Sequence, residues 1–198
     1  MSDAPNAAPD RIERVAVVGG AGSMGHGIVI ACLLGSPDAE VRLVARRRES
    51  LEHGLKLVRA GPFGLDGAVR KGRIDAATRD RALARLKPTL DLADGVRDAQ
   101  IVFESVPEIV EQKIEALREI EAAAPRGAVI ASGTSSIMIG ELGRALAHVD
   151  RLVGTHWFYP SNVMPLVEVA RADRSAPWAT ERIVSYLMLR SLKQARYS

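Results

Sequence analysis

The sequence of 198 residues is poor in cysteine, in aromatic residues and in long apolar runs. Because Cys32 is the only cysteine, a disulfide within these residues is excluded, and no thiolate metal site is expected. No apolar run approaches the roughly 20 residues that span a bilayer, so we expect no membrane partner. The net charge is only +3, and the basic residues are not interleaved with aromatic ones. We therefore expect no nucleic-acid partner.

The beginning of the chain lacks the apolar core of a secretion signal. Residues 1–10 are polar and rich in alanine and proline, which favours a disordered leader at residues 1–12 and a cytoplasmic protein. The remaining length suits a single α/β domain with its own core. We place that domain at residues 13–188.

Short apolar runs alternate with longer segments of helical character. Strands are expected at residues 15–19, 41–45, 99–105, 128–132 and 151–156. Helices are expected at residues 22–34, 49–59, 75–86, 108–124, 137–147 (capped by Ser135 or Ser136) and 177–192, with a loop or broken helix at residues 61–72. This alternation predicts an α/β fold with a mostly parallel sheet that helices cover on both faces.

The polar segments that stand out all follow the ends of these strands. A glycine turn follows the first strand, arginines follow the second, and a Glu-x-Val-Pro-Glu segment follows the third. Thr134 and Ser135 follow the fourth strand, and His156 ends the fifth. Open parallel sheets bind ligands at the carboxyl ends of their strands, so one binding site is expected at that edge.

The glycine turn has the G-x-G-x-x-G pattern of dinucleotide binding. It comprises Gly20, Ala21, Gly22, Ser23, Met24 and Gly25, between an apolar strand and a small-residue helix that contains Cys32. In that context the pattern predicts a Rossmann-type, doubly wound domain. We expect Gly20 to allow the turn, Gly22 to let a pyrophosphate approach, and Gly25 to let the helix pack closely. The alternative is a glycine-rich loop in a packing site.

The end of the second strand bears on which nicotinamide cofactor binds. NAD-binding domains usually carry an acidic residue there, which binds the ribose 2′-hydroxyl. This chain has Ala45 followed by Arg46 and Arg47. Because arginine pairs with phosphate through two parallel hydrogen bonds, this sequence favours NADP slightly over NAD. A solvated arginine cluster at a helix start is the alternative.

Together these motifs resemble the NAD-binding N-terminal domain of the L-3-hydroxyacyl-CoA dehydrogenases. The resemblance covers roughly residues 15–184 and includes the glycine turn, the segment 104–108, the Thr134-Ser135-Ser136 turn and the stretch 156–168. It implies an oxidoreductase of fatty acid metabolism that acts on the 3-hydroxy or 3-keto group of an acyl-CoA. By resemblance, the catalytic residues are Ser135, His156 and Glu168, and the cofactor contacts include Glu108, Lys113 and Ser135.

The oxidation of an alcohol requires side chains of the same types. Oxidation of a secondary alcohol removes a hydride from carbon and a proton from oxygen, and imidazole accepts a proton near neutral pH. A carboxylate on the other ring nitrogen would fix the tautomer, and a turn at residues 160–165 would bring Glu168 to His156. Ser135 would hold the substrate oxygen. His53 and His148 lack such a context and are expected at the surface, whereas Trp157 and Phe158 are expected in the core.

The chain departs from that family within these motifs. The family usually has asparagine at the positions of Gly133 and Tyr159, and the second asparagine normally contacts the cofactor. The glycines and proline of residues 61–67 interrupt the helical excursion that binds the CoA nucleotide in the family. These differences leave open a dehydrogenase of a small hydroxy compound without CoA, of the carnitine, gulonate or diketone type.

The end of the chain departs from the family as well. The family continues into a helical domain that completes the substrate cleft and builds the dimer, whereas residues 189–198 read as an atypical, foreign or frame-shifted tail. We expect that domain to be missing, an apolar face to be exposed, and the protein partner to be a second copy or a separate helical domain. A catalytically incomplete dinucleotide-binding module therefore remains an alternative function.

Overall fold

The structure, a computed structural model, describes residues 11–189 and 194–197. The expected leader falls on residues 1–12, of which 1–10 lie outside the described residues. The expected atypical tail at residues 189–198 lies partly outside them, and residues 194–197 of that tail form a strand. No helix in the described ranges is long and apolar enough to cross a membrane.

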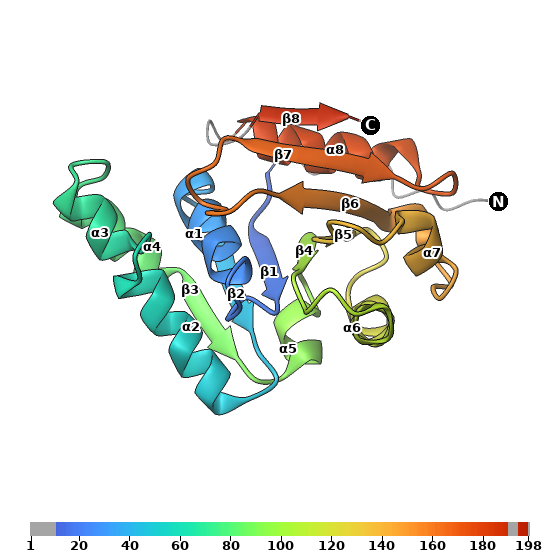
Figure 1. The fold of residues 1–198 in the computed structure, drawn as a ribbon, viewed down its shortest axis with the longest axis horizontal. Coiled ribbons are helices and arrows are strands. Elements are labelled where there is room, and N and C mark those ends of the chain that lie inside the picture. The colour runs from blue at the N-terminus through green and yellow to red at the C-terminus, as the bar shows by residue number, and fades with distance from the viewer. Residues whose placement is uncertain (1–10, 190–193, 198) are drawn as a thin grey trace.

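One sheet of eight strands forms the centre of the described part of the chain (Figure 1). The strands are β1 (Arg14–Val18), β2 (Glu40–Val44), β3 (Leu86–Thr89), β4 (Ile101–Glu104), β5 (Val129–Ser132), β6 (Leu152–Trp157), β7 (Leu166–Arg171) and β8 (Gln194–Tyr197). Their order in the sheet is β3-β2-β1-β4-β5-β6-β7-β8. All neighbours are parallel except β6 and β7, which pair antiparallel. The predicted α/β, Rossmann-type and mostly parallel sheet is confirmed.

Helices follow most of the strands and cover both faces of the sheet (Figure 1). They are α1 (Gly25–Gly35), α2 (Arg48–Ala60), α3 (Leu65–Arg70), α4 (Ala76–Ala84), α5 (Leu92–Val96), α6 (Val110–Ala123), α7 (Ile139–Gly143) and α8 (Pro177–Leu189), with a 3-10 turn at Val149–Arg151. Helices α2, α3 and α4 form an excursion between β2 and β3 that extends away from the sheet (Figure 1). The broken helix expected at residues 61–72 is α3 with the loop before it.

The central strands β1, β4 and β5 are buried on both faces, which explains their mainly apolar sequences. Successive side chains of a strand point to opposite faces, so Val15 and Val17 of β1 join one core cluster and Ala16 and Val18 join another. The first cluster includes buried residues of α1 and α8, and the second includes residues of α5, α6 and α7. Each strand end is therefore held by packing from two sides.

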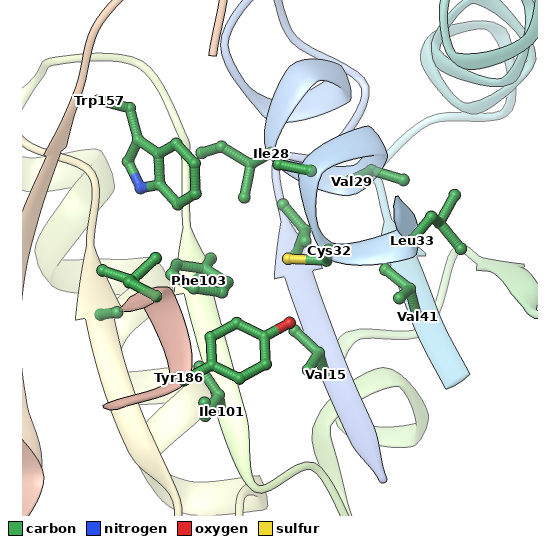
Figure 2. Packing of buried hydrophobic residues seen from close by; sticks show 14 of the residues in the cluster. Val15, Ile28, Val29, Cys32, Leu33, Val41, Ile101, Phe103, Trp157 and Tyr186 are labelled. Atoms are coloured by element: carbon green, nitrogen blue, oxygen red, sulfur yellow. The ribbon is translucent and has the colours of Figure 1, made fainter. Parts of the chain in front are cut away.

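Three aromatic side chains pack together beneath the end of β6 (Figure 2). The Phe103 ring is fully buried, and its centroid lies 5.6 Å from that of Trp157 in an edge-to-face arrangement at 82°. Tyr186 of α8 lies 6.2 Å from Phe103, and its hydroxyl oxygen is 2.9 Å from the Ser36 Oγ that donates to it. Trp157 is thus a core residue, as expected, and its packing fixes the strand end that carries His156. Cys32 is also buried, as expected.

The segment expected to form a helix at residues 137–147 is helical only at Ile139–Gly143. Met138 occupies the N-cap position without a side-chain hydrogen bond, so the prediction that Ser135 or Ser136 caps this helix is wrong. The backbone amides of both serines donate instead to the Glu108 carboxylate. The Glu108 carboxylate therefore holds the turn at these serines, and the helix begins only after it.

Three strands were not expected from the sequence. Residue 86 was placed at the end of a helix, but that helix ends at Ala84 and Leu86 begins β3. Pro88 lies within β3, which is an edge strand, where the missing amide hydrogen is tolerated. The other two, β7 and β8, complete the opposite side of the sheet. Strands this short carry too little periodicity to be separated from loops by sequence alone.

We predict that Phe103→Ala destabilises the protein by about 3–5 kcal/mol, because it removes a fully buried ring that contacts two others. The measurement is urea unfolding followed by circular dichroism. Met188→Ala is the control, since Met188 is 56% exposed on α8, and it should change the free energy of unfolding by less than about 0.5 kcal/mol. Equal effects of the two substitutions would contradict the packing described here.

Candidate functional site

The carboxyl ends of the parallel strands surround a cavity of about 990 Å³. Its walls come from the glycine turn after β1, the end of β2, the start of α2, and the segments after β4, β5 and β6. The volume lies at the upper end of the roughly 300–1,000 Å³ that is usual for ligand pockets. The expectation of one site at this edge of the sheet is therefore met by a cavity of suitable size.

The glycine turn forms one wall of the cavity and brings backbone close to any occupant. Gly19 has a φ of 79°, and a Cβ there would lie 2.5 Å from the Ser105 carbonyl oxygen. At Gly25 a Cβ would lie 2.3 Å from the Gly19 carbonyl oxygen, which is the close packing of helix on strand predicted for this position. The left-handed conformation lies at Gly19 rather than at Gly20, where the sequence pattern placed the tight turn.

The donors of this turn fit the pyrophosphate of a dinucleotide. Ala21, Gly22, Ser23 and Met24 line the cavity, and α1 begins directly after them. The Ala21 and Ser23 amides donate to no acceptor within the described part of the chain. Free amides at a helix N-terminus attract phosphate through hydrogen bonds and the partial positive charge of the helix dipole. Within the described ranges, no group of three or more His, Cys, Asp or Glu side chains could hold a metal ion.

His156 and Glu168 form a hydrogen-bonded pair beside the cavity. They face each other directly in the antiparallel pairing of β6 with β7, and the His156 Nδ1 atom lies 2.8 Å from Glu168 Oε2. Because an ionised carboxylate only accepts hydrogen bonds, Nδ1 carries the hydrogen in this pair, and in the neutral form of the ring the lone pair lies on Nε2. His156 lines the cavity, so the pairing with Glu168 selects the tautomer in which Nε2 is the nitrogen that can accept a proton.

Neighbouring side chains hold the His156 ring in place. The Phe158 ring centroid lies 4.6 Å from that of the imidazole, at an angle of 47°. Phe158 is half-buried and lines the cavity, whereas the sequence placed it in the core behind the site. The side chains of His156 and Glu168 are 33% and 48% exposed. The pair is therefore accessible from solvent as well as from the cavity.

Ser135 lies in a turn that a single carboxylate oxygen organises. Glu108 Oε1 accepts hydrogen bonds from Thr134 Oγ1 at 2.7 Å, from the Ser135 amide at 2.8 Å and from the Ser136 amide at 2.9 Å. Burial opposes ionisation of this carboxyl, but these hydrogen bonds outweigh it, and the pKa of Glu108 falls to about 2. Glu108 is thus ionised at neutral pH, and both it and Ser135 line the cavity.

Lys113 lies outside the cavity wall, although it was predicted to contact the cofactor. Its side chain is only 1% exposed, and its Nζ atom lies 2.9 Å from Glu104 Oε1 and 3.3 Å from Glu108 Oε2.

Gly133 stands where the family usually has asparagine, and the surrounding backbone gives a local reason for glycine. A Cβ there would lie 2.8 Å from the Glu104 carbonyl oxygen, so the backbone directly after β5 lies too close to the end of β4 to leave room for a side chain.

The residues proposed to select the cofactor differ in their positions. Ala45 and Arg46 line the cavity at the end of β2, whereas Arg47 occupies the N-cap position of α2 and does not. The Arg46 guanidinium reaches across to α6, where it lies 3.3 Å from Glu115 and 3.8 Å from Glu119. Of the two guanidiniums, only that of Arg46 is placed to meet a cofactor in the cavity.

Several lining residues were not found by sequence reasoning. Glu49, Ser50 and His53 reach the cavity from the first turns of α2, and His53 is exposed, as expected. The sequence signal that could have identified them is their position: they lie about one helical turn apart, in the helix that directly follows the end of β2. Tyr159 also lines the cavity, and its ring meets Phe63 of the excursion edge-to-face at 5.9 Å.

Comparisons with known proteins show which family the chain resembles. The family model described as "3-hydroxyacyl-CoA dehydrogenase, NAD binding domain" matches residues 14–194. A peroxisomal fatty acid beta-oxidation multifunctional protein from Oryza sativa subsp. japonica is 32% identical over 86% of this chain. The match covers 23% of that protein, so the chain spans less than a quarter of the length of this curated relative.

Solved structures share this fold. The crystal structure of M. tuberculosis FadB2 has a TM-score of 0.87 and 34% identity, with 96% of this chain and 64% of that chain covered. The (S)-3-hydroxybutyryl-CoA dehydrogenase PaaH1 from Ralstonia eutropha has a TM-score of 0.86 and 30% identity, with 94% and 63% covered. The chain thus spans slightly under two thirds of each.

We predict that Glu108→Gln removes a pH-dependent part of the stability. The pKa of Glu108 is depressed from 4.5 to about 2 in the folded protein, so its stabilising effect is complete above pH 4.5 and is lost as the pH falls toward 2. The difference in free energy of unfolding between wild type and Glu108→Gln should therefore shrink over that range. Urea unfolding from pH 3 to pH 7 measures it, with the exposed Glu111→Gln as control. A pH-independent difference would contradict the assignment.

Proposed function

Because the chain belongs to the family of 3-hydroxyacyl-CoA dehydrogenase NAD-binding domains, we propose that it transfers a hydride between a nicotinamide cofactor and the 3-hydroxy or 3-keto group of an acyl-CoA. His156 is the general base in this proposal. The observation that carries it is the His156–Glu168 pair, whose atoms are 2.8 Å apart beside a cavity that the glycine turn also lines. The substrate class is inferred from the names of the family and of its relatives.

Each side chain has a separate part in the proposed reaction. The bound nicotinamide supplies the hydride acceptor. The glycine-turn amides and the start of α1 hold the pyrophosphate, and Ser135 Oγ donates a hydrogen bond to the substrate oxygen and so orients it. His156 Nε2 removes the hydroxyl proton. Glu168 keeps the ring in the required tautomer and stabilises the imidazolium that forms.

Two alternatives differ from this proposal in substrate and in activity. Tyr159 and Phe63 form an aromatic contact between the catalytic stretch and the helical excursion, which favours a compact substrate without CoA. The second alternative is a catalytically incomplete module that binds the cofactor without turnover. A second copy of the chain or a separate helical domain would then complete the cleft.

For the cofactor, we propose a preference for NADP over NAD through Arg46. Its two ion pairs are exposed, and pairs of this kind contribute only about 0.2–1 kcal/mol each. Hydrogen bonds to a charged group contribute about 1.5–3 kcal/mol. Arg46 could therefore leave Glu115 and Glu119 for a 2′-phosphate at a net gain, and Ala45 offers no carboxylate to a 2′-hydroxyl.

We predict that the chain reduces acetoacetyl-CoA with a reduced nicotinamide cofactor, and that His156→Ala lowers kcat by about 10²–10⁴-fold through loss of the general base. The loss of nicotinamide absorbance measures the rate. His148→Ala is the matched control, because His148 is exposed and outside the cavity wall. Cofactor binding without turnover would overturn the proposal in favour of the incomplete module, and turnover only of a hydroxy compound without CoA would favour the smaller substrate.

We predict that Arg46→Ala weakens NADPH binding at least about fivefold, or roughly 1 kcal/mol, while NADH binding changes little. Arg47→Ala removes the same charge from a residue outside the cavity wall and should leave both affinities unchanged. Ala45→Asp should reverse the preference, because its carboxylate repels a 2′-phosphate and accepts from a 2′-hydroxyl. Isothermal titration calorimetry measures all three variants. Identical NADH and NADPH affinities throughout would argue against selection at this strand end.

A further inference from the structure

A buried ion pair lies directly behind the Ser135 turn. Glu104 ends β4 and is 0% exposed, and Lys113 of α6 is 1% exposed. The Lys113 Nζ atom lies 2.9 Å from Glu104 Oε1 and 3.2 Å from Oε2. Neither residue lines the cavity, so this pair is not explained by direct contact with a ligand there.

The remaining hydrogen-bonding capacity of Glu104 is used within the protein. The Val106 amide donates to Oε1 at 2.8 Å, and Ser132 Oγ donates to Oε2 at 2.6 Å. The carboxylate thus joins the loop after β4, the end of β5 and helix α6. A buried charge is tolerated when it is paired and fully hydrogen-bonded, and Glu104 meets both conditions.

Lys113 extends this network toward the site. Besides Glu104, its ammonium donates to the Val106 carbonyl oxygen at 3.3 Å and lies 3.3 Å from Glu108 Oε2. The other oxygen of Glu108 is the acceptor that organises the Thr134-Ser135-Ser136 turn. A continuous series of contacts therefore leads from Glu104 through Lys113 and Glu108 to Ser135.

We propose that Glu104 and Lys113 are positioning residues for Ser135, acting through Glu108. The buried pair fixes the ammonium, the ammonium holds Glu108 Oε2, and this orients Glu108 Oε1 toward the serine turn. A buried ion pair adds little net stability, because the cost of desolvation offsets the attraction between the charges. The effect of the pair is instead to fix a position, since Glu104 holds the ammonium of the flexible Lys113 side chain in one place beneath the serine turn.

The first test uses amide hydrogen exchange measured by NMR, which requires no activity. Because Lys113→Met alone would leave Glu104 buried and unpaired, the main variant is the double substitution Glu104→Gln with Lys113→Met, which removes both charges together. The Ser135 and Ser136 amides should exchange at least about tenfold faster in this variant, relative to core amides such as those of Val102 and Ile130.

The matched control for that test is Ser132→Ala. It removes a buried hydrogen bond to the same carboxylate but leaves the contacts of Lys113 with Glu104 and Glu108. The relative exchange of the serine amides should then match that of wild type. Unchanged serine exchange in the double variant would overturn the proposal, and so would equal acceleration in Ser132→Ala, which would indicate a general loosening.

A second test rests on the proposed function and measures kcat in a double-mutant cycle with Ser135→Ala. Removal of the pair should lower kcat at least about tenfold when Ser135 is present and less than about twofold when it is absent. Equal losses in both backgrounds would mean that the pair supports the fold and does not act through Ser135. If neither the wild type nor any variant turns over substrate, the proposed function fails, but the hydrogen-exchange measurement still decides the role of the Glu104–Lys113 pair.

Discussion

Parallel pairing of the central strands places their carboxyl ends along one edge of the sheet, and the cavity of the candidate site depends on this. Strands β2, β1, β4 and β5 are adjacent and parallel, so segments far apart in the sequence converge around one cavity. Because these strands are buried on both faces, polar side chains are admitted mainly where the strands end. The same constraint concentrates hydrogen-bonding groups at this edge.

The reversal of direction between β6 and β7 serves a different purpose. An antiparallel pair places two residues directly opposite each other, and here they are His156 and Glu168. A parallel neighbour would have needed a long crossover connection before it could present a carboxylate at the same level. The proposed base and the group that orients it therefore depend on the backbone register of two strands. Aromatic packing of Phe103 against Trp157 holds that register from below.

The ion pairs on the two sides of the cavity differ in their exposure to solvent. At the end of β2, Arg46 forms exposed ion pairs that a phosphate could replace at small cost. Beneath β4 and β5, Glu104 and Lys113 form a pair that excludes water almost completely. The first arrangement leaves a guanidinium available to a ligand, and the second fixes a turn. The depressed pKa of Glu108 is consistent with a carboxylate that is ionised at neutral pH for this purpose.

The sequence by itself determined the doubly wound sheet, the glycine turn and the strand ends at which Ser135 and His156 lie, because apolar runs and glycine spacing are local properties. Only the tertiary structure decided that Lys113 turns inward and that Arg46 reaches α6. It also decided that Glu108, rather than a helix cap, organises the serine turn. These contacts join segments that meet only through the order of the strands, and local periodicity carries no information about which distant groups will share a buried charge.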